Sequence, residues 1–189
     1  MGLTLTSAPA SEPVSTSEAK AHLRVDTPDE DTYIGTLVAA ARTWVEQVTR
    51  RALITQTFTL KRDDFWRGWC SLHVPRPPLQ SVSSIQYVDA DGNTQTWASS
   101  NYEVDTSSTP GRIVLADGVS FPTTADQVNA ATVTFVAGYG AASAIPADLV
   151  HAVKLKVGSL YWNREADEIA AISLLEPYRV LDERVTLVV

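Results

Sequence analysis

Residues 26–53, DTPDEDTYIGTLVAAARTWVEQVTRRAL, carry the clearest helix signal in the chain. Thr27 and Glu30 stand at capping-box spacing and mark its start, while Arg50 and Arg51 complement the negative end of the helix dipole. Apolar residues recur at helical spacing along the stretch and form one face. That face consists of Ile34, Leu37, Val38, Ala41, Trp44, Val45 and Val48. We therefore expect one long amphipathic helix.

The segment before this helix divides in two. Residues 1–14 are rich in Ser, Thr, Ala and Pro, show no periodicity, and are typical of a flexible N-terminal arm. Ser15 and Glu18 stand at capping-box spacing and predict a short helix near residues 16–23. Residues 15–53 are therefore expected to supply the N-terminal helices of a helical body.

Residues 54–138 change to β character. The stretch begins with ITQTFTLKRDDF, which is β-branched and alternates in polarity. Asp91-Gly92 and Pro110-Gly111 each separate two apolar runs and predict hairpin turns. This stretch is expected to form a small antiparallel β insert.

Helical periodicity returns after the insert. Pro146 suits the first helical position, and residues 146–173 are expected to form the C-terminal helix of the body. Residues 174–189 contain a proline breaker and end in VTLVV, which predicts an extended, apolar tail. The expected fold is α+β, with N-terminal and C-terminal helices packed together, an inserted antiparallel β domain and an extended tail.

The sequence VAGYG, at residues 136–140, raises the question of a phosphate-binding loop. A dinucleotide fingerprint needs a third glycine where Ser143 stands, and a Walker loop needs a Gly-Lys pair that is absent. The simpler interpretation is a hinge, in which Gly138 and Gly140 end the β insert and the chain turns into the helix that starts at Pro146.

Composition restricts the function. The 189 residues carry a net charge of −7, which argues against a cationic nucleic-acid groove as the main surface. The single cysteine, Cys70, forms no internal disulfide or thiolate metal site, and His22, His73 and His151 lie in different predicted elements. No apolar run approaches the ~20 residues of a membrane helix. We expect no catalytic, metal or cofactor site, no membrane association and no small-molecule substrate.

Aromatic and acidic residues keep two other functions open. Trp66 and Trp69 lie beside a glycine bend, as in carbohydrate-binding modules, whereas Trp44 and Trp162 lie on predicted helices where packing is the usual role. Aspartate clusters such as Asp63-Asp64 are compatible with a paired-acid enzyme, although a strand end explains that cluster more simply.

The order of motifs across residues 17–180 resembles the head–tail connector (adaptor) proteins of long-tailed bacteriophages and of phage-like gene transfer particles. The stretches that carry the resemblance are, in order, YIGTLVAAARTWVEQVTRRALITQTF, VPRPPLQSVSSIQYVDADGN, NYEVDTSSTPGRIVLADG, ATVTFVAGYG, IPADLVHAVKLKVGSLYWNRE and LLEPYRV. None of them is catalytic, and their order and spacing carry the specificity.

The resemblance implies a structural protein of the virion neck that is assembled in the host cytoplasm. Such adaptors form a homo-oligomeric ring, dodecameric by resemblance, that joins the portal protein to the stopper or tail protein. DNA passes through the ring channel without specific binding. The C-terminal segment reaches the portal or a neighbouring ring, which assigns partner contacts to Tyr178, Arg179, Val180, Leu181, Val185, Leu187 and Val189. The alternatives are a stopper or tail-completion protein of the same neck, and a carbohydrate- or surface-binding β module.

Overall fold

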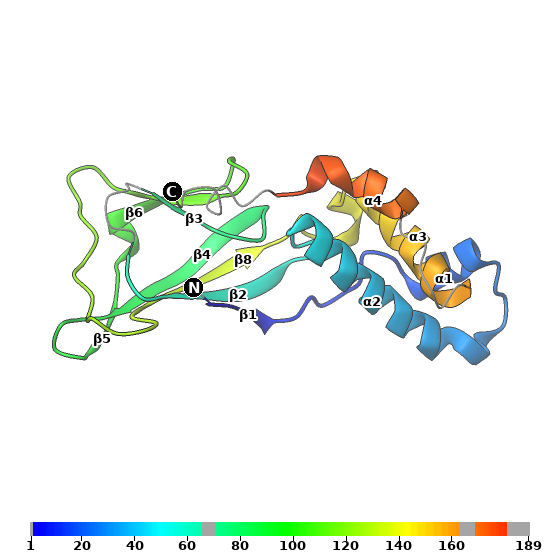
Figure 1. Ribbon diagram of the computed structural model, residues 1–189, viewed down its shortest axis with the longest axis horizontal. Coiled ribbons are helices and arrows are strands. Elements are labelled where there is room, and N and C mark those ends of the chain that lie inside the picture. The colour runs from blue at the N-terminus through cyan, green and yellow to red at the C-terminus, as the bar shows by residue number, and fades with distance from the viewer. Residues whose placement is uncertain (1, 66–70, 163–168, 181–189) are drawn as a thin grey trace. The chain divides into compact units, whose positions relative to one another are not determined.

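The computed structural model describes residues 2–65, 71–162 and 169–180 (Figure 1). The chain divides into two compact units. The sheet unit consists of Met1–Ala10 and Thr55–Gly138, and the helical unit consists of Ser11–Ile54 and Tyr139–Val189. The sheet unit is therefore inserted into the helical unit, and both units are built from segments far apart in sequence.

The helical unit is built around two long helices that lie side by side, α2 and α3 (Figure 1). They run in opposite directions, since Tyr33 in the first turn of α2 lies against Tyr161 in the last turn of α3. The helical elements, including the short 3-10 turns η1, η3 and η4, are α1 (Thr16–Leu23), η1 (Pro28–Glu30), α2 (Asp31–Thr49), η3 (Ala142–Ala144), α3 (Ala147–Trp162), α4 (Ile169–Leu175) and η4 (Glu176–Tyr178).

The apolar face predicted for the long helix forms the centre of the helical core. Its buried members are Ile34, Leu37, Val38, Ala41 and Val45, while Trp44 and Val48 pack against the cluster at half-buried positions. From the other segment, α3 contributes a matching row of buried side chains, which are Leu149, Ala152, Val153 and Val157. The predicted packing of N-terminal helices on a C-terminal helix is confirmed.

One of the two predicted capping boxes forms. Ser15 accepts the Glu18 N–H, and the Glu18 carboxylate accepts the Ser15 N–H at 2.9 Å. The box predicted at Thr27 is absent, because Thr27 makes no side-chain cap and a 3-10 turn precedes α2. The Glu30 carboxylate instead accepts a 2.6 Å hydrogen bond from the Tyr161 hydroxyl. Glu30 therefore makes a contact across 131 residues where the sequence predicted a local one.

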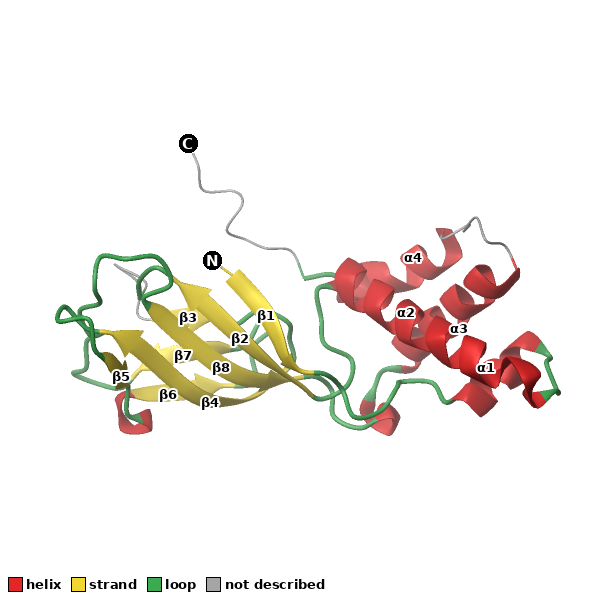
Figure 2. Ribbon diagram, turned by 90° about the horizontal axis from the view of Figure 1, so that it is seen from below, coloured by secondary structure: helices red, strands yellow, loops and turns green. Residues whose placement is uncertain are grey.

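The sheet unit contains two antiparallel sheets (Figure 2). The five-stranded sheet has the order β1-β2-β8-β4-β5, and the three-stranded sheet has the order β3-β7-β6. The predicted antiparallel insert and both hairpins are confirmed. The strands are β1 (Gly2–Ser7), β2 (Gln56–Arg62), β3 (Ser71–His73), β4 (Leu79–Val88), β5 (Thr94–Thr96), β6 (Tyr102–Asp105), β7 (Arg112–Leu115) and β8 (Ala131–Ala137).

The expected flexible arm, residues 1–14, is wrong for its first half. Strand β1 pairs with β2 along the edge of the larger sheet, and Leu3 and Leu5 lie opposite Leu60 and Phe58. The LTLT alternation of residues 3–6 has the period of a strand, which the Ser- and Thr-rich composition concealed. The N-terminal segment is therefore part of the sheet.

The expected extended tail, residues 174–189, begins later than predicted. Leu174 and Leu175 belong to α4, and η4 continues the helical path to Tyr178. Arg179 is the first extended residue, with φ −64° and ψ 127°. Residues 181–189 lie outside the described part of the chain.

Aromatic side chains form a core between the two sheets. Trp97 follows β5 in the larger sheet, and its ring stacks on Tyr102 of the smaller sheet with centroids 5.4 Å apart. The rings of Phe65 and Phe121 stack at 5.3 Å in the same cluster. The two sheets also approach each other closely at Gly111, where an added Cβ would lie 2.5 Å from Leu79 Cβ. Glycine permits this close approach of the backbone.

A part-buried ionic network lies in the helical unit close to the point where the chain passes into the sheet unit. The Arg42 guanidinium donates to Glu12 at 2.7 Å and to Glu46 at 2.9 Å. The other Glu46 oxygen accepts the Leu53 N–H at 2.9 Å, and the Leu53 carbonyl accepts the Tyr139 N–H at 3.1 Å. Burial lowers the pKa of Arg42, but Glu12 and Glu46 outweigh burial and leave it above its usual value.

Replacement of Gly111 by alanine should destabilise the sheet unit. The added methyl group overlaps Leu79 and forces the two sheets apart, and overpacking of this kind costs roughly 1–3 kcal/mol. Urea unfolding of Gly111→Ala measures the loss. Gly2→Ala is the control, because a Cβ at Gly2 meets nothing within 4 Å. Equal midpoints for the two variants would contradict the close-packing argument.

Removal of the Glu46 carboxylate should destabilise the helical unit. Glu46→Ala leaves Arg42 with Glu12 as its remaining carboxylate and leaves the buried Leu53 N–H without its acceptor, and an unsatisfied buried donor costs about 1–3 kcal/mol. Both side chains of the pair are nearly buried, at 12% and 10% exposure, so solvent screening is small. Thermal unfolding compares this variant with Gln47→Ala, a substitution at the exposed neighbouring position. A loss below ~1 kcal/mol would mean that the network has no role in stability.

Candidate assembly site

The predicted partner-binding segment starts at a root that is fixed to the helical unit. We define the tail root as residues 178–180. The Tyr178 carbonyl accepts a hydrogen bond from Arg51 Nε at 2.7 Å, and the Val180 N–H donates to the Thr49 carbonyl at 3.0 Å. Thr49, the last residue of α2, and Arg51, just after the helix, therefore hold the backbone of the tail root on both sides of Arg179.

The side chains of the tail root divide between the protein and the solvent. The Tyr178 hydroxyl donates to Asp148 at 3.2 Å, and its ring packs against the helical core. Burial, followed by the bond to Asp148, raises the pKa of Tyr178. Arg179 is exposed and pairs with Glu176 at 2.9 Å. Of the described residues assigned to partner contact, Arg179 presents the most accessible side chain.

The other residues assigned to partner contact, Leu181, Val185, Leu187 and Val189, lie outside the described residues. Their assignment stays a prediction that rests on the family resemblance and on the apolar sequence. The structure gives the position of Val180, the residue just before them, which lies beside the carboxyl end of α2.

The predicted hinge residues have the backbone conformations of a glycine-dependent turn. Gly138 has φ 128° and Gly140 has φ 113°, both in the region that disfavours residues with a side chain. The Gly138 N–H donates to the Pro78 carbonyl at 2.9 Å, and its carbonyl accepts from Gln80 Nε2 at 2.7 Å. The turn is thus anchored in the sheet unit just before the chain enters the helical unit.

Pro146 precedes α3 rather than opening it. The helix begins at Ala147, and the Pro146 carbonyl accepts hydrogen bonds from the N–H groups of Leu149 and Val150 at 3.0 and 3.2 Å. Pro146 therefore occupies the N-cap position of α3, whereas the sequence predicted it at the first helical position. Its ring restricts the backbone where the glycine turn ends.

The histidines are distributed over both units. His73 lies in β3 of the sheet unit, whereas His22 on α1 and His151 on α3 interact within the helical unit. Burial, then the charges of His151 and Lys154, lowers the pKa of His22. Among residues 2–65, 71–162 and 169–180, no three His, Cys, Asp or Glu side chains gather as metal ligands. Over the same ranges, no helix has the length and apolar character that crossing a membrane requires.

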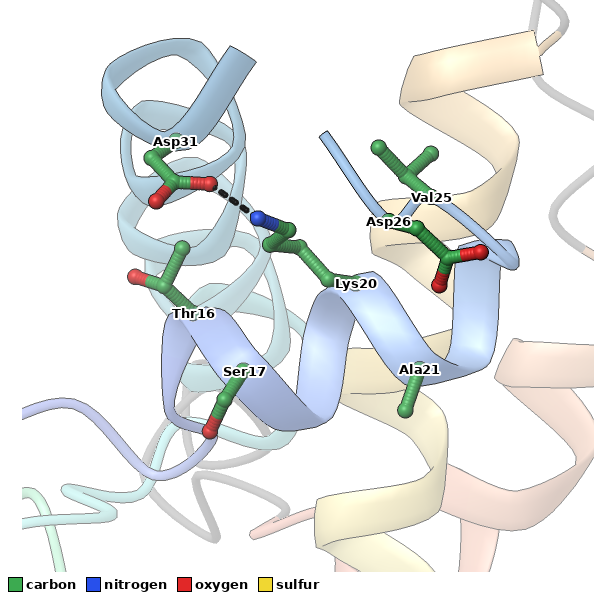
Figure 3. Close-up of a pocket in the computed structure, with 7 residues that line it drawn as sticks. All are labelled: Thr16, Ser17, Lys20, Ala21, Val25, Asp26 and Asp31. Carbon is green, nitrogen blue, oxygen red and sulfur yellow. Dashed lines mark hydrogen bonds and ion pairs between the residues drawn. The ribbon is translucent and has the colours of Figure 1, made fainter. Parts of the chain in front are cut away.

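A surface pocket of about 520 Å³ lies beside α1 (Figure 3). Lys20 reaches from α1 to Asp31 at the start of α2, and the two charged atoms are 2.6 Å apart. The remaining lining residues are Thr16, Ser17, Ala21, Val25 and Asp26. The only cation in this lining is already paired, so the pocket offers carboxylate and hydroxyl oxygens to its surroundings.

An exposed aromatic cluster is the feature that the sequence did not predict. We define the aromatic patch as Tyr33, Tyr161 and Trp162. Trp162 was expected to pack, yet 66% of it is exposed, and Tyr33 is 45% exposed. The Tyr161 ring lies between them, with centroids 4.8 Å from Trp162 and 6.3 Å from Tyr33. Trp66 and Trp69, on which the carbohydrate-binding alternative depends, lie outside the described residues, as does Cys70.

Insertion of side chains at the glycine turn should harm folding. Valine at both Gly138 and Gly140 would have to adopt positive φ, at roughly 1–2 kcal/mol per residue. Space is not the obstacle at Gly140, where a Cβ would meet only Ala144 at 3.9 Å. The melting temperature of the double variant should fall, while that of a Gly2→Val control stays unchanged. An unchanged melting temperature in the double variant would contradict the assignment of Gly138 and Gly140 as hinge residues.

Comparison with known proteins assigns the chain to a class. A family model described as head completion protein matches residues 13–171. A chain from the neck of an empty gene transfer agent particle, computed with C6 symmetry, has 26% sequence identity and a TM-score of 0.80, with 96% of each chain covered. A chain from the virion of a native gene transfer agent particle has 27% identity and a TM-score of 0.80, with 97% of this chain and 100% of that chain covered.

A third structure, the neck of a native gene transfer agent particle computed with C12 symmetry, has 25% identity, a TM-score of 0.74 and 96% coverage of both chains. No curated protein matches the sequence. The predicted fold class and the predicted class of function, a structural protein of the virion neck, are confirmed. The chain belongs to the head completion protein family.

Proposed function

We propose that the chain is a head–tail adaptor that forms a ring between the portal of a capsid and the stopper or tail. The likeness to neck chains over 96% of the sequence is the observation that carries this proposal. In such a ring the protein works by contact with other chains and performs no catalysis. It has no need of a cofactor, a metal or a small-molecule substrate.

The symmetries of the similar necks support a ring of twelve copies. One neck was computed with C6 symmetry and another with C12 symmetry. A twelvefold axis contains a sixfold axis, so a dodecamer satisfies both. Rings of this kind close through heterologous contacts between two different surfaces of the same chain.

Net charge supports the proposed passage of DNA. Each copy carries −7, and a ring repeats that charge around its axis. A negatively charged ring does not hold the phosphate backbone, because no excess of Lys and Arg is available to replace the counterions of DNA. DNA would therefore pass the channel without specific binding.

The fixed tail root supports the assignment of residues 181–189 to a neighbouring ring. Thr49 and Arg51 hold the backbone up to Val180, so the body of the protein sets the point from which the remaining residues extend. Those residues include Val185, Leu187 and Val189, whose period of two suits addition to a partner as a strand. We assign the portal as that partner.

Truncation after Val180 should separate attachment from folding. A chain of residues 1–180 keeps the bonds to Thr49, Arg51 and Asp148, so its melting temperature should match that of the full chain. Particles that lack the protein should be completed by the full chain and not by the truncated one. Electron microscopy of heads with and without tails provides the measurement.

Two outcomes of that experiment would change the proposal. Normal joining of heads and tails by residues 1–180 would show that the tail assignment is wrong. A full-length ring located below another adaptor, without contact to the portal, would favour the stopper or tail-completion function. A chain of residues 1–177 is the matched comparison, because it also loses the root bonds and should lose stability.

A further inference from the structure

Charged and titratable side chains meet where α1 packs against α3. His22 is in the last turn of α1, and its imidazole lies over Gly158 of α3, with Nε2 3.5 Å from the position that a Cβ would occupy there. One turn earlier on α1, the Glu18 carboxylate lies 3.5 Å from Lys154 Nζ of α3. These two contacts place one face of α1 against one face of α3.

The same face of α3 carries a second histidine. His151, Lys154 and Gly158 stand at the spacing i, i+3 and i+7, which aligns them along one side of a helix. On α1, Glu18 and His22 are four residues apart and are aligned in the same way. We define the α1–α3 joint as Glu18, His22, His151 and Lys154, which together supply two imidazoles, one ammonium group and one carboxylate.

The other charged groups at the contacts of α1 are balanced or positive. On the α2 side, Lys20 pairs with Asp31 at 2.6 Å, so this contact brings one charge of each sign. Arg24, at the C-cap of α1, adds a positive charge at the end of the helix that carries His22. Among the described residues of the joint itself, Glu18 is the single carboxylate that offsets positive charge.

Acidification makes the joint repulsive. Histidine gains its positive charge between about pH 8 and pH 5. Hydrogen bonds from Ser15 lower the pKa of Glu18, so its carboxylate stays charged over this range and the negative charge of the joint does not change. Each proton that a histidine takes up therefore adds to the positive charge of Lys154, and like charges at this distance repel.

The pKa of His22 gives the sign of the effect on stability. Burial, then the charges of His151 and Lys154, holds this pKa below the ordinary value of 6.5. Such a histidine binds its proton more readily when α1 has left α3 than when it is docked. The stabilisation is therefore fully present above pH 6.5 and is lost as the pH falls below it.

We propose that the α1–α3 joint is a pH-sensitive contact, which is closed at neutral pH and opens when its two histidines gain charge. Both histidines are exposed to solvent, so protons reach them without prior unfolding. Helix α1 contributes the buried side chains of Ala19 and Leu23 to the helical core, so opening of the joint uncovers part of that core. The inference concerns the single chain and does not depend on assembly into a ring.

Hydrogen exchange of the full chain tests this contact. The protection of the backbone N–H groups of α1, corrected for the intrinsic exchange rate at each pH, should fall at least ~3-fold from about pH 7.5 to about pH 5.5. The N–H groups of the paired strands β2 and β8, in the separate sheet unit, are the internal control and should keep their protection. In the double variant His22→Asn, His151→Asn, the protection of α1 should stay constant over the same range.

Two further variants keep both histidines and separate charge from packing. Glu18→Gln and Lys154→Gln break the same ion pair, so a purely structural effect would be alike in both. Glu18→Gln removes the negative charge of the joint while glutamine still suits the capping box, and it should enlarge the loss of α1 protection on acidification. Lys154→Gln removes a positive charge and should reduce that loss.

Three results would overturn the proposal. The first is α1 protection in the natural chain that does not change with pH, and the second is an equal fall of protection in β2 and β8. The third is a change in the same direction for Glu18→Gln and Lys154→Gln. If the double histidine variant has already lost α1 protection at pH 7.5, these two variants decide the question, because both retain the imidazoles.

Discussion

The whole structure depends on closing the β insert at a single point of the chain. On the helical side, the Tyr139 N–H donates to the Leu53 carbonyl, and the Leu53 N–H is held by Glu46. On the sheet side, Gln56 at the start of β2 is paired with Ala137 at the end of β8. Bringing the ends of a long segment together costs loop-closure entropy, which grows only slowly with length. The hydrogen bonds at Leu53 and Tyr139 in the helical unit, and the pairing of β2 with β8 in the sheet unit, hold the two ends of the insert together and offset this cost. Residues 139–180 can therefore complete the helical core although the insert is long.

The sequence predicted those elements whose signals are local. Periodicity located α2 and its buried face, hairpin turns located β4–β5 and β6–β7, and the Ser15 box located α1. It was wrong where a distant residue decides the outcome. Strand β1 needs β2, which lies about 50 residues away, and its Ser- and Thr-rich surroundings have the composition of a flexible arm. The Thr27 box is absent, and the Glu30 carboxylate instead accepts a hydrogen bond from Tyr161, in the other segment of the helical unit.

The sequence predicted which segment binds a partner but not how the root of that segment is held. The apolar tail sequence indicated a partner-binding segment, but nothing local shows that Arg51 and Thr49 hold its root, because these bonds join residues more than 120 positions apart. The aromatic patch has a signal that can be read in retrospect. Leu160, Tyr161 and Trp162 are consecutive, and at 100° per residue they span about 200° of the helix circumference, more than one core-facing stripe covers. At least one of them had to face solvent, and Trp162 does.

The bonds that hold the tail root on the helical unit suit a protein that acts through contacts with other chains. Tyr178 packs on the helical core and the Val180 N–H bonds to Thr49 at the end of α2, so the tail root is joined to this helix. That helix carries opposite charge at its two ends, and both ends are bonded within the chain, Asp31 to Lys20 and Arg51 to the Tyr178 carbonyl. In the proposed ring, the residues after Val180 would start from equivalent positions, because closed symmetry repeats the position of every Val180 around the axis.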